Sequence, residues 1–401
     1  MRLWAVSQLL PAKAWSYFYQ YNEFARIAWA LASGHGYSSP WANTPLLPTA
    51  IEPPAYSFLL AGIFKMAGVY ALGSLWIAVV LNAVFSSANA VLILRAGKRD
   101  FTSSAAVLAA WVWSCWTYEA VVAIRLWESS LTALLLMLAL LWLPRVERST
   151  RTSPWLLFGV LAGFAGLTNT TLLAIIPAFA LWTWIECRRR GQPRGPQLLA
   201  FCAVFLIVLV PWTIRNYIVF HRLMPVRDNF GLELWLGNHP SPTAASDNDF
   251  PVLDPTAYNQ LGEIRFMERK REMALRFIYE QPQQFLRRSL HRVWLFWIEP
   301  VKSAWGEISV LAWLGCFLAW RKRKAIAVPY AIVMILFPTV YYITHTYDTY
   351  RHPMEPVIIL LACYAVTEIT ATMGRRLRLP GWKNDDVLAN PTGPSLQCRA
   401  C

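Results

Sequence analysis

The sequence predicts an all-α fold: a polytopic bundle of transmembrane helices with amphipathic helices and a large loop outside the membrane. Three observations predict it. Apolar residues make up 56% of the 401 residues while 15% are charged, which excludes an ordinary soluble domain. The apolar residues gather in blocks, most of them close to the 17–25 residues that cross a bilayer. The 21 tryptophans suit the belts that membrane proteins place at headgroup depth.

Nine apolar blocks follow one another along the chain. Two of them are short and must extend through flanking residues, which makes Leu167–Thr171 a turn outside the membrane. The blocks are Leu72–Leu94, Ser104–Ala123, Leu126–Leu143, Leu156–Leu167, Leu172–Trp184, Leu198–Ile214, Ser303–Trp320, Ala325–Ile343 and Pro353–Ile369.

Basic clusters set the orientation of these blocks. The formal charge is +14. The basic residues gather where apolar blocks end, as at Lys98-Arg99, Arg188–Arg190 and Arg321–Lys324. Cytoplasmic loops carry such clusters. The pattern argues against nucleic acid as a partner, since that role requires a basic face on a soluble fold.

This orientation divides the chain into five parts. Residues 1–71 form an external N-terminal loop with interfacial helices, 72–214 form transmembrane helices, and 215–300 form a large external loop. Residues 301–372 form the C-terminal transmembrane helices, and 373–401 form a cytoplasmic tail that we expect to be disordered. Because no span precedes the external residues 1–71, we expect either a missing N-terminal span or unaided insertion.

Both external parts contain helical patterns. Ser57–Ala67 is apolar but too short to span, which predicts a helix at the membrane interface. The pattern over Leu261–Trp297 predicts a helix that is broken near Pro282, with basic and apolar residues interleaved. A soluble-surface helix and a membrane-surface helix fit the second pattern equally well.

Cysteine and histidine spacing does not predict a metal site. The seven cysteines are scattered, mostly in apolar runs, without ligand spacing backed by His. No cofactor is predicted, and a divalent metal stays open.

Two carboxylates are candidates for catalysis. Glu23 and Arg26 share a helical face by their spacing, and Glu23 fits a catalytic base or an interfacial carboxylate equally. Glu128 opens a span, where it could also stabilise the helix N-terminus.

Several other residues at the external span ends are candidates for substrate binding. Arg215 and Arg351 could each clamp a phosphate, because a guanidinium offers a fixed fork of donors. Arg26 and Arg125 could instead reach to lipid headgroups. The remaining candidates are Asn216, Arg227, Asn229, Tyr350 and His352.

The residues at these positions resemble the GT-C class of membrane glycosyltransferases, in particular family 39. That family includes dolichyl-phosphate-mannose–protein mannosyltransferases and aminoarabinose transferases. The resemblance runs from about Tyr17 to Ile369. The segments that carry it are Glu23–Ala28 with Leu31–Pro40, Pro48–Ala50 with Pro53–Tyr56, Leu59–Phe64, Trp127–Leu131, Pro211–Tyr217, Asn229–Asn238 and Tyr350–Pro356.

The resemblance implies a polyprenyl-phosphate sugar donor and transfer to a lipid, glycan or protein acceptor on the non-cytoplasmic face of a membrane, in bacteria the inner membrane. It implies that Glu23 is the base, that Glu128 helps bind metal or acceptor, and that Arg215 and Arg351 hold the donor phosphate. The sequence departs from the family where Asn22-Glu23 replaces an acidic pair common in some relatives.

Two other functions stay open at this point. A transporter or flippase for a lipid-linked or small polar substrate would also be polytopic, but such proteins commonly show internal repeats, and no repeat is evident. A non-catalytic assembly factor with the same fold is the third reading.

Overall fold

The computed structural model describes residues 22–38, 40–41, 45–123, 125–240, 255–298, 305–322 and 324–377. Within these residues it is helical, with one isolated β-bridge between Ser38 and Pro48. The predicted all-α fold is confirmed. From residue 378 onward, the predicted cytoplasmic tail lies outside the described residues.

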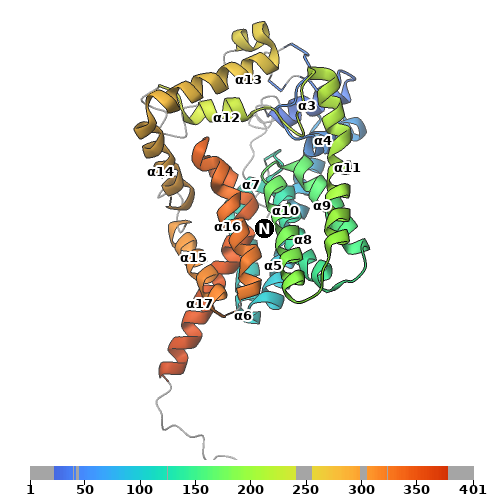
Figure 1. The fold of residues 1–401 in the computed structure, drawn as a ribbon. Helices are drawn as coiled ribbons and strands as arrows, with labels where there is room; N and C mark the ends of the chain where they lie inside the picture. The colour runs from blue at the N-terminus through green and yellow to red at the C-terminus, as the bar shows by residue number, and fades with distance from the viewer. Residues whose placement is uncertain are drawn as a thin grey trace, which may run out of the picture.

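A bundle of long helices forms one layer of the molecule (Figure 1). Each predicted apolar block corresponds to a helix, except that the second is divided between two. The bundle consists of α5 (Leu72–Asp100), α6 (Ser103–Cys115), α7 (Thr117–Ala123), α8 (Ser129–Arg148), α9 (Ser153–Thr168), α10 (Leu172–Arg189), α11 (Gly195–Phe220), α15 (Trp305–Lys322), α16 (Lys324–Ile343) and α17 (Glu355–Leu377).

Five helical stretches in the described part of the chain are long and apolar enough to cross a membrane: Leu72–Asp100, Ser129–Arg148, Gly195–Phe220, Ala325–Ile343 and Thr349–Met373. Exposed side chains on them are largely apolar, such as Leu206 and Ile207 of α11, exposed by 56% and 64%. A helix surface of this kind suits lipid rather than water. The chain is an integral, multi-pass membrane protein.

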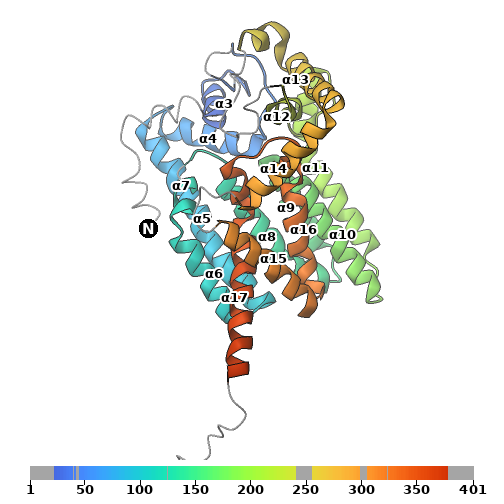
Figure 2. The ribbon, with the colours of Figure 1, turned by 90° about the vertical axis from the view of Figure 1, so that its left-hand side faces the viewer.

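A second layer covers one end of the bundle, and we call it the cap (Figures 1 and 2). It comprises α3 (Glu23–Ala32), α4 (Pro54–Ala67), α12 (Phe230–Gly237) and α13 (Pro255–Glu280) with their connecting segments. The predicted interfacial helix is part of α4, and the predicted break near Pro282 separates α13 from α14 (Pro282–Ile298). Pro282 fits the first position of α14 because that position needs no backbone N–H.

Two parts of the chain that are distant in sequence build the cap together. Arg215 donates to the carbonyl oxygens of Thr49 (2.7 Å) and Tyr37 (2.9 Å). Glu263 of α13 accepts from the Thr49 hydroxyl (2.5 Å) and the Ala50 amide (2.6 Å). The cap also has its own apolar core, which includes Ile27, Ile51, Trp235 and Phe266.

One close approach fixes the cap against the bundle. A Cβ atom at Gly237 would lie 1.7 Å from the carbonyl oxygen of Thr344, after α16. Only glycine permits this contact. Arg292 of α14 closes the junction, since it donates to that same carbonyl and to the side-chain oxygen of Asn238 (2.9 Å).

The opposite end of the bundle carries the basic clusters. Arg190 at the end of α10 forms ion pairs with Glu147 (2.5 Å) and Glu186 (2.9 Å). Lys322 at the end of α15 pairs with Glu368. The cap and the basic clusters therefore lie at opposite ends, as the sequence pattern predicts.

Candidate active site

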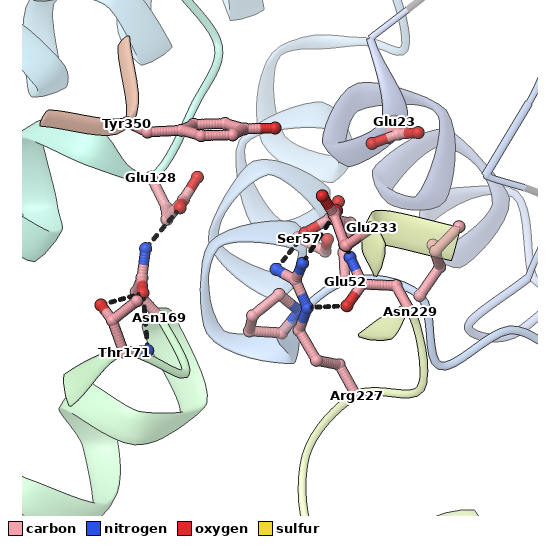
Figure 3. Close-up of polar contacts among 12 residues, drawn as sticks. Glu23, Glu52, Ser57, Glu128, Asn169, Thr171, Arg227, Asn229, Glu233 and Tyr350 are labelled. Atoms are coloured by element: carbon pink, nitrogen blue, oxygen red, sulfur yellow. Dashed lines mark hydrogen bonds and ion pairs between the residues drawn. The ribbon is translucent and has the colours of Figure 1, made fainter. Parts of the chain in front are cut away.

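Four carboxylates line the junction where the cap rests on the bundle, and we call them the acidic group (Figure 3). Glu23 begins α3, Glu52 precedes α4, Glu128 precedes α8 and Glu233 lies in α12. Three of them come from the cap and Glu128 comes from the bundle. The assembly of four carboxylates at one place is costly unless other groups compensate it.

Glu23 is positioned by local helix chemistry. The Asn22 side chain accepts a hydrogen bond from the Ala25 amide N–H (3.0 Å) and thereby caps the N-terminus of α3. The Glu23 carboxylate accepts the indole N–H of Trp41 at 2.6 Å. Its side chain is half-buried, so one face stays available to a ligand.

Glu52 is the most enclosed partner of Glu23. It is 5% exposed, and its carboxylate lies 3.6 Å from the Arg227 guanidinium. Burial raises the pKa of Glu52 well above its usual range; Arg227 opposes this rise, and the charge of Glu23 adds to it. Burial and the neighbouring Glu23 therefore both favour the protonated form of Glu52.

Arg227 is the central cation of the group. Its guanidinium donates to Asn229 (2.5 Å) and lies 3.3 Å from Glu233. Asn229 donates in turn to Glu233 (2.7 Å). Burial would lower the pKa of Arg227, but Glu52 and Glu233 outweigh burial and raise it. The charge of Arg227 offsets much of the repulsion within the acidic group.

Glu128 has a different environment. Its Oε1 accepts from Asn169 (2.9 Å), whose own side-chain oxygen is fixed by the amide and hydroxyl of Thr171. Its Oε2 is buried and makes no hydrogen bond to the described residues. Burial raises the pKa of Glu128 to about 7, although Asn169 and Arg227 oppose the rise. Glu128 can therefore exchange a proton near neutral pH.

Tyr350 completes the site from the turn between α16 and α17. Its ring stacks on Tyr341 at 4.9 Å between centroids. Figure 3 shows its hydroxyl pointing toward Glu23. The structure thus brings together five of the residues singled out from the sequence: Glu23, Glu128, Arg227, Asn229 and Tyr350.

Arg26 and Arg125 flank this group, three residues after Glu23 and three residues before Glu128. Arg26, one turn after Glu23, stacks on Trp29 at 4.0 Å, and its Nε makes no hydrogen bond to the described residues. The backbone of Arg125 is held by Asn82, which donates to its carbonyl at 2.9 Å.

Arg215 and Asn216 serve the cap junction. The Arg215 guanidinium is used by the carbonyls of Thr49 and Tyr37 and packs on Trp212 at 4.9 Å. Asn216 is fully buried and donates to the carbonyls of Met224 and Val226. Both therefore hold the backbone that frames the site.

Arg351 and His352 lie inside the bundle. Arg351 is 1% exposed, pairs with Glu355 at 2.5 Å and donates to Ser309 at 2.8 Å. His352 is fully buried, with its ring 5.7 Å from that of Trp113. Their described contacts tie α17 to its neighbours.

Sequence reasoning missed three residues of the site. Glu52 stands between Ile51 and Pro53-Pro54, an odd place for a charge, and that oddity was the available signal. Asn169 looked like an ordinary turn residue. His345 had no pattern around it, because its partners Glu233 and Tyr350 come from different elements.

The described residues do not assemble a metal site. They contain no group of three or more His, Cys, Asp or Glu side chains that could hold a metal ion. The carboxylates of Glu128 and Glu233 already accept from Asn169, Asn229 and Arg227.

Known proteins share both a sequence segment and the fold. Residues 51–214 match the model of the family described as dolichyl-phosphate-mannose-protein mannosyltransferase. The chain resembles a GT-C membrane glycosyltransferase. This likeness, stated above from the sequence, is confirmed. The matched segment contains Glu52 and Glu128 of the acidic group. No curated protein matches the chain in sequence.

Solved structures extend the likeness to most of the fold. ArnT from Cupriavidus metallidurans, bound to undecaprenyl phosphate, is 15% identical with a TM-score of 0.53, covering 93% of this chain and 61% of ArnT. The Archaeoglobus fulgidus oligosaccharyltransferase, in complex with Zn and sulfate, is 14% identical with a TM-score of 0.53, covering 90% and 46%. AglB from the same organism, with an inhibitory peptide and a dolichol-phosphate, is 14% identical with a TM-score of 0.50, covering 93% and 48%. At these identities the likeness concerns the fold, and this chain spans less than two thirds of each matched protein.

Proposed function

We propose that the protein transfers a sugar from a polyprenyl-phosphate donor to a lipid, glycan or protein acceptor. The observation that carries the proposal is the acidic group, with half-buried Glu23 at the junction of cap and bundle. The family match over residues 51–214 and the GT-C fold support it.

The reaction requires little of the protein beyond a base and a held leaving group. An acceptor O–H or N–H attacks the anomeric carbon, and its proton passes to the Glu23 carboxylate. The bond between that carbon and the phosphate oxygen breaks, and its electron pair stays on the polyprenyl phosphate. Proton removal by a positioned carboxylate accounts for about 10²–10⁴ of the rate.

Neighbouring residues prepare Glu23 for this role. The Trp41 indole N–H donates to the Glu23 carboxylate at 2.6 Å and fixes its orientation. Glu52 instead pairs with Arg227 at 3.6 Å, and this contact orients it away from the role of base. Glu128, with a free buried Oε2, accepts a hydrogen bond from the acceptor.

The donor phosphate needs positive charge and hydrogen-bond donors. We propose Arg26, Arg125 and Tyr350 for this task. The two Nη atoms of Arg215 donate to backbone carbonyls, and Nη1 of Arg351 donates to Ser309 while its Nε faces Glu355. These two arginines act in our proposal by holding the backbone of the site.

The cap faces the non-cytoplasmic side in this proposal. The basic clusters at the other end of the bundle, including Arg190 and Lys322, favour a cytoplasmic position for that end. In a bacterium the site would then open to the periplasm or exterior from the inner membrane.

A transfer assay in membranes tests the proposal. The chain is incubated with a panel of polyprenyl-phosphate sugars labelled in the sugar, and compared with its Glu23→Gln variant. Glu186→Gln, at the basic end of the bundle, is the matched control. We expect transfer by the wild type and the control, and loss of transfer in Glu23→Gln.

Two results would overturn the proposal. Transfer by Glu23→Gln at the wild-type rate would remove Glu23 as the base. Movement of intact donor across the membrane, with no sugar transfer from any donor, would instead show that the protein is a transporter.

A further inference from the structure

Helix α13 forms the outer edge of the cap, at the top of Figures 1 and 2. Its residue Glu263 is 5% exposed. Oε2 of Glu263 accepts from the Thr49 hydroxyl (2.5 Å) and the Tyr258 hydroxyl (2.9 Å). Oε1 accepts from the Ala50 amide (2.6 Å). Because Ala50 lies two residues before Glu52, a single carboxylate of α13 holds the backbone that leads into the acidic group.

A break in α13 allows two of its side chains to meet at this place. Gly262 has a φ of +74° and a ψ of 165°, a backbone conformation that favours glycine. In an unbroken helix, residues five positions apart point about 140° away from each other. The break removes this divergence, and the Tyr258 hydroxyl reaches the Glu263 carboxylate.

Tyr258 extends the contact to Glu23. Its ring packs edge-on against the ring of Trp41, with the two centroids 4.8 Å apart. The indole N–H of Trp41 in turn donates to Glu23 at 2.6 Å. Tyr258 is 1% exposed and also packs against Phe266, so its ring has a fixed place. Through Tyr258, α13 therefore fixes the residue that bonds the proposed base.

We propose that Glu263 and Tyr258 are positioning residues for the transfer reaction. By fixing the segment that begins at Trp41, they hold Glu23 and Glu52 at their places in the acidic group. The inference rests on the proposed function, since it takes Glu23 as the base. Both residues act through this segment and not on the reacting atoms.

The strength of the contact depends on the charge of Glu263. Burial raises the pKa of Glu263 to about 7, although its three hydrogen bonds oppose the rise, and Asp228 adds to it. An ionised carboxylate accepts stronger hydrogen bonds than a neutral carboxyl group does. The segment is therefore held most firmly above pH 7, and the hold weakens as the pH falls below 7 and Glu263 takes up a proton.

Charged and titratable groups from several elements face Glu263. The charge of Arg215, near the end of α11, favours the ionised carboxylate, while Asp228, before α12, opposes it. Tyr258 of α13 and Tyr37 of the N-terminal part are the phenols nearby. Burial raises the pKa of both phenols, so they keep their protons throughout the range in which Glu263 titrates.

The test compares the wild type with Glu263→Gln in the sugar-transfer assay from pH 5.5 to pH 8.5, with each rate divided by the amount of folded protein. Glutamine keeps the size of the side chain and resembles the neutral carboxyl group. We expect the variant to be about 10- to 100-fold slower than the wild type at pH 8. At pH 5.5 the two rates should be equal, because the wild-type carboxyl group is then neutral as well.

The ratio of the two rates separates positioning from stability. Groups that both proteins share, such as Glu128 with its pKa of about 7, titrate in both and leave the ratio unchanged. A loss of stability alone would lower the amount of folded protein, which the measured rate already takes into account. The pH dependence of the ratio therefore reports on Glu263.

Thr49 supplies a second pair of variants. Thr49→Val removes the hydroxyl that bonds Glu263 and should lower the rate at pH 8, whereas Thr49→Ser keeps a hydroxyl and should transfer like the wild type. This pair decides the matter if Glu263→Gln fails to fold. Glu268→Gln is the matched control, since Glu268 lies on the same helix and pairs with Arg222. It should keep the wild-type rate at each pH.

Hydrogen exchange tests the same contact without any transfer. At pH 8 the Ala50 amide donates to the ionised Glu263 carboxylate in the wild type. Exchange at this amide should be about tenfold faster in Glu263→Gln, because a hydrogen bond to a charged group becomes one to a neutral group. Equal exchange in the two proteins would contradict the hold on the segment.

Wild-type rates in both Glu263→Gln and Thr49→Val at pH 8, or a rate ratio that does not change with pH, would overturn the positioning role. If the wild type transfers sugar while these results hold, only this role fails. If the wild type transfers no sugar, the proposed function fails and the positioning role fails with it. Faster exchange in Glu263→Gln would then show a contact that serves the fold of the cap alone.

Discussion

Buried carboxylates occur at both ends of the bundle, and the two places differ in how their charge is balanced. At the basic end, both carboxylate oxygens of Asp100 accept hydrogen bonds from Arg99 at 2.6 Å, and one of them also accepts from the Tyr330 hydroxyl at 2.6 Å. At the cap end, Glu52 and Glu233 share the charge of Arg227, and Glu128 keeps an unbonded buried oxygen.

This difference separates buried charges that stabilise the fold from buried charges that can serve a function. A carboxylate whose bonds are all used, as at Asp100, stabilises the fold without capacity for a ligand. Carboxylates that outnumber their partners remain in place because the surrounding fold holds them. We therefore expect variants at the two ends to separate activity from stability.

The largest effect is expected when Glu23 is changed. Glu23→Gln keeps the size of the side chain and removes the base, so the transfer rate should fall about 10²–10⁴-fold. Its midpoint of thermal unfolding should stay close to that of the wild type. Turnover and unfolding are measured on the same purified sample. A large loss of stability with little loss of rate would reverse the roles that we assign to the two ends.

The second prediction concerns the pH dependence of stability at Glu128. Burial raises the pKa of Glu128 to about 7 from 4.5, so the folded state holds a proton that the unfolded chain releases. Stability therefore falls as pH rises from about 4.5 to 7, by about 3 kcal/mol. Glu128→Gln should lack this fall and be the more stable protein at pH 8.

Unfolding monitored from pH 5 to pH 8 checks this prediction. Glu263, whose pKa is also raised to about 7 by burial, contributes a fall of the same sign in both proteins. Identical pH profiles for the wild type and Glu128→Gln would contradict the environment described for Glu128.

A smaller effect is expected at the basic end. Asp100→Asn leaves Arg99 without its ionic partner, and we expect a loss of about 2 kcal/mol in the free energy of unfolding. The loss should be moderate because the Arg99 side chain is 28% exposed. The transfer rate of the folded variant should equal that of the wild type, and a large loss of rate would erase the contrast between the ends.

The smallest effect concerns backbone packing at the junction. Gly237→Ala would force its Cβ against the Thr344 carbonyl, and we expect a loss of about 1–2 kcal/mol. Gly62→Ala, within α4 where a Cβ meets nothing within 4 Å, should instead be neutral or slightly stabilising. Equal stabilities of the two variants in a denaturant titration would contradict the close approach.

The comparison also explains what sequence could predict. Apolar blocks and basic clusters are local patterns, so helices such as α5 and α16 and the opposition of cap and basic ends could be predicted. Glu23 and Glu128 were found because each stands at the start of a helix in a segment resembling a known family. The partners of these residues are set by tertiary packing, which leaves no local trace.

The predicted role of Arg215 and Arg351 at the donor phosphate stays a prediction. Both stand where a phosphate-binding arginine is expected, and their residue type suits that role. Their described bonds go to backbone carbonyls and to Glu355. Conversely, Asn169 looked like a turn residue, yet it holds Glu128 from a loop 41 positions away in sequence.

The most direct measurement follows both halves of a doubly labelled donor in a single turnover. The donor carries one label in the sugar and another in the phosphate of undecaprenyl phosphate. Our account predicts that the wild type moves the sugar label to the acceptor and leaves the phosphate label on the lipid, while Glu23→Gln leaves both labels on intact donor. Movement of both labels together across the membrane, or separation of the labels by Glu23→Gln at the wild-type rate, would contradict it.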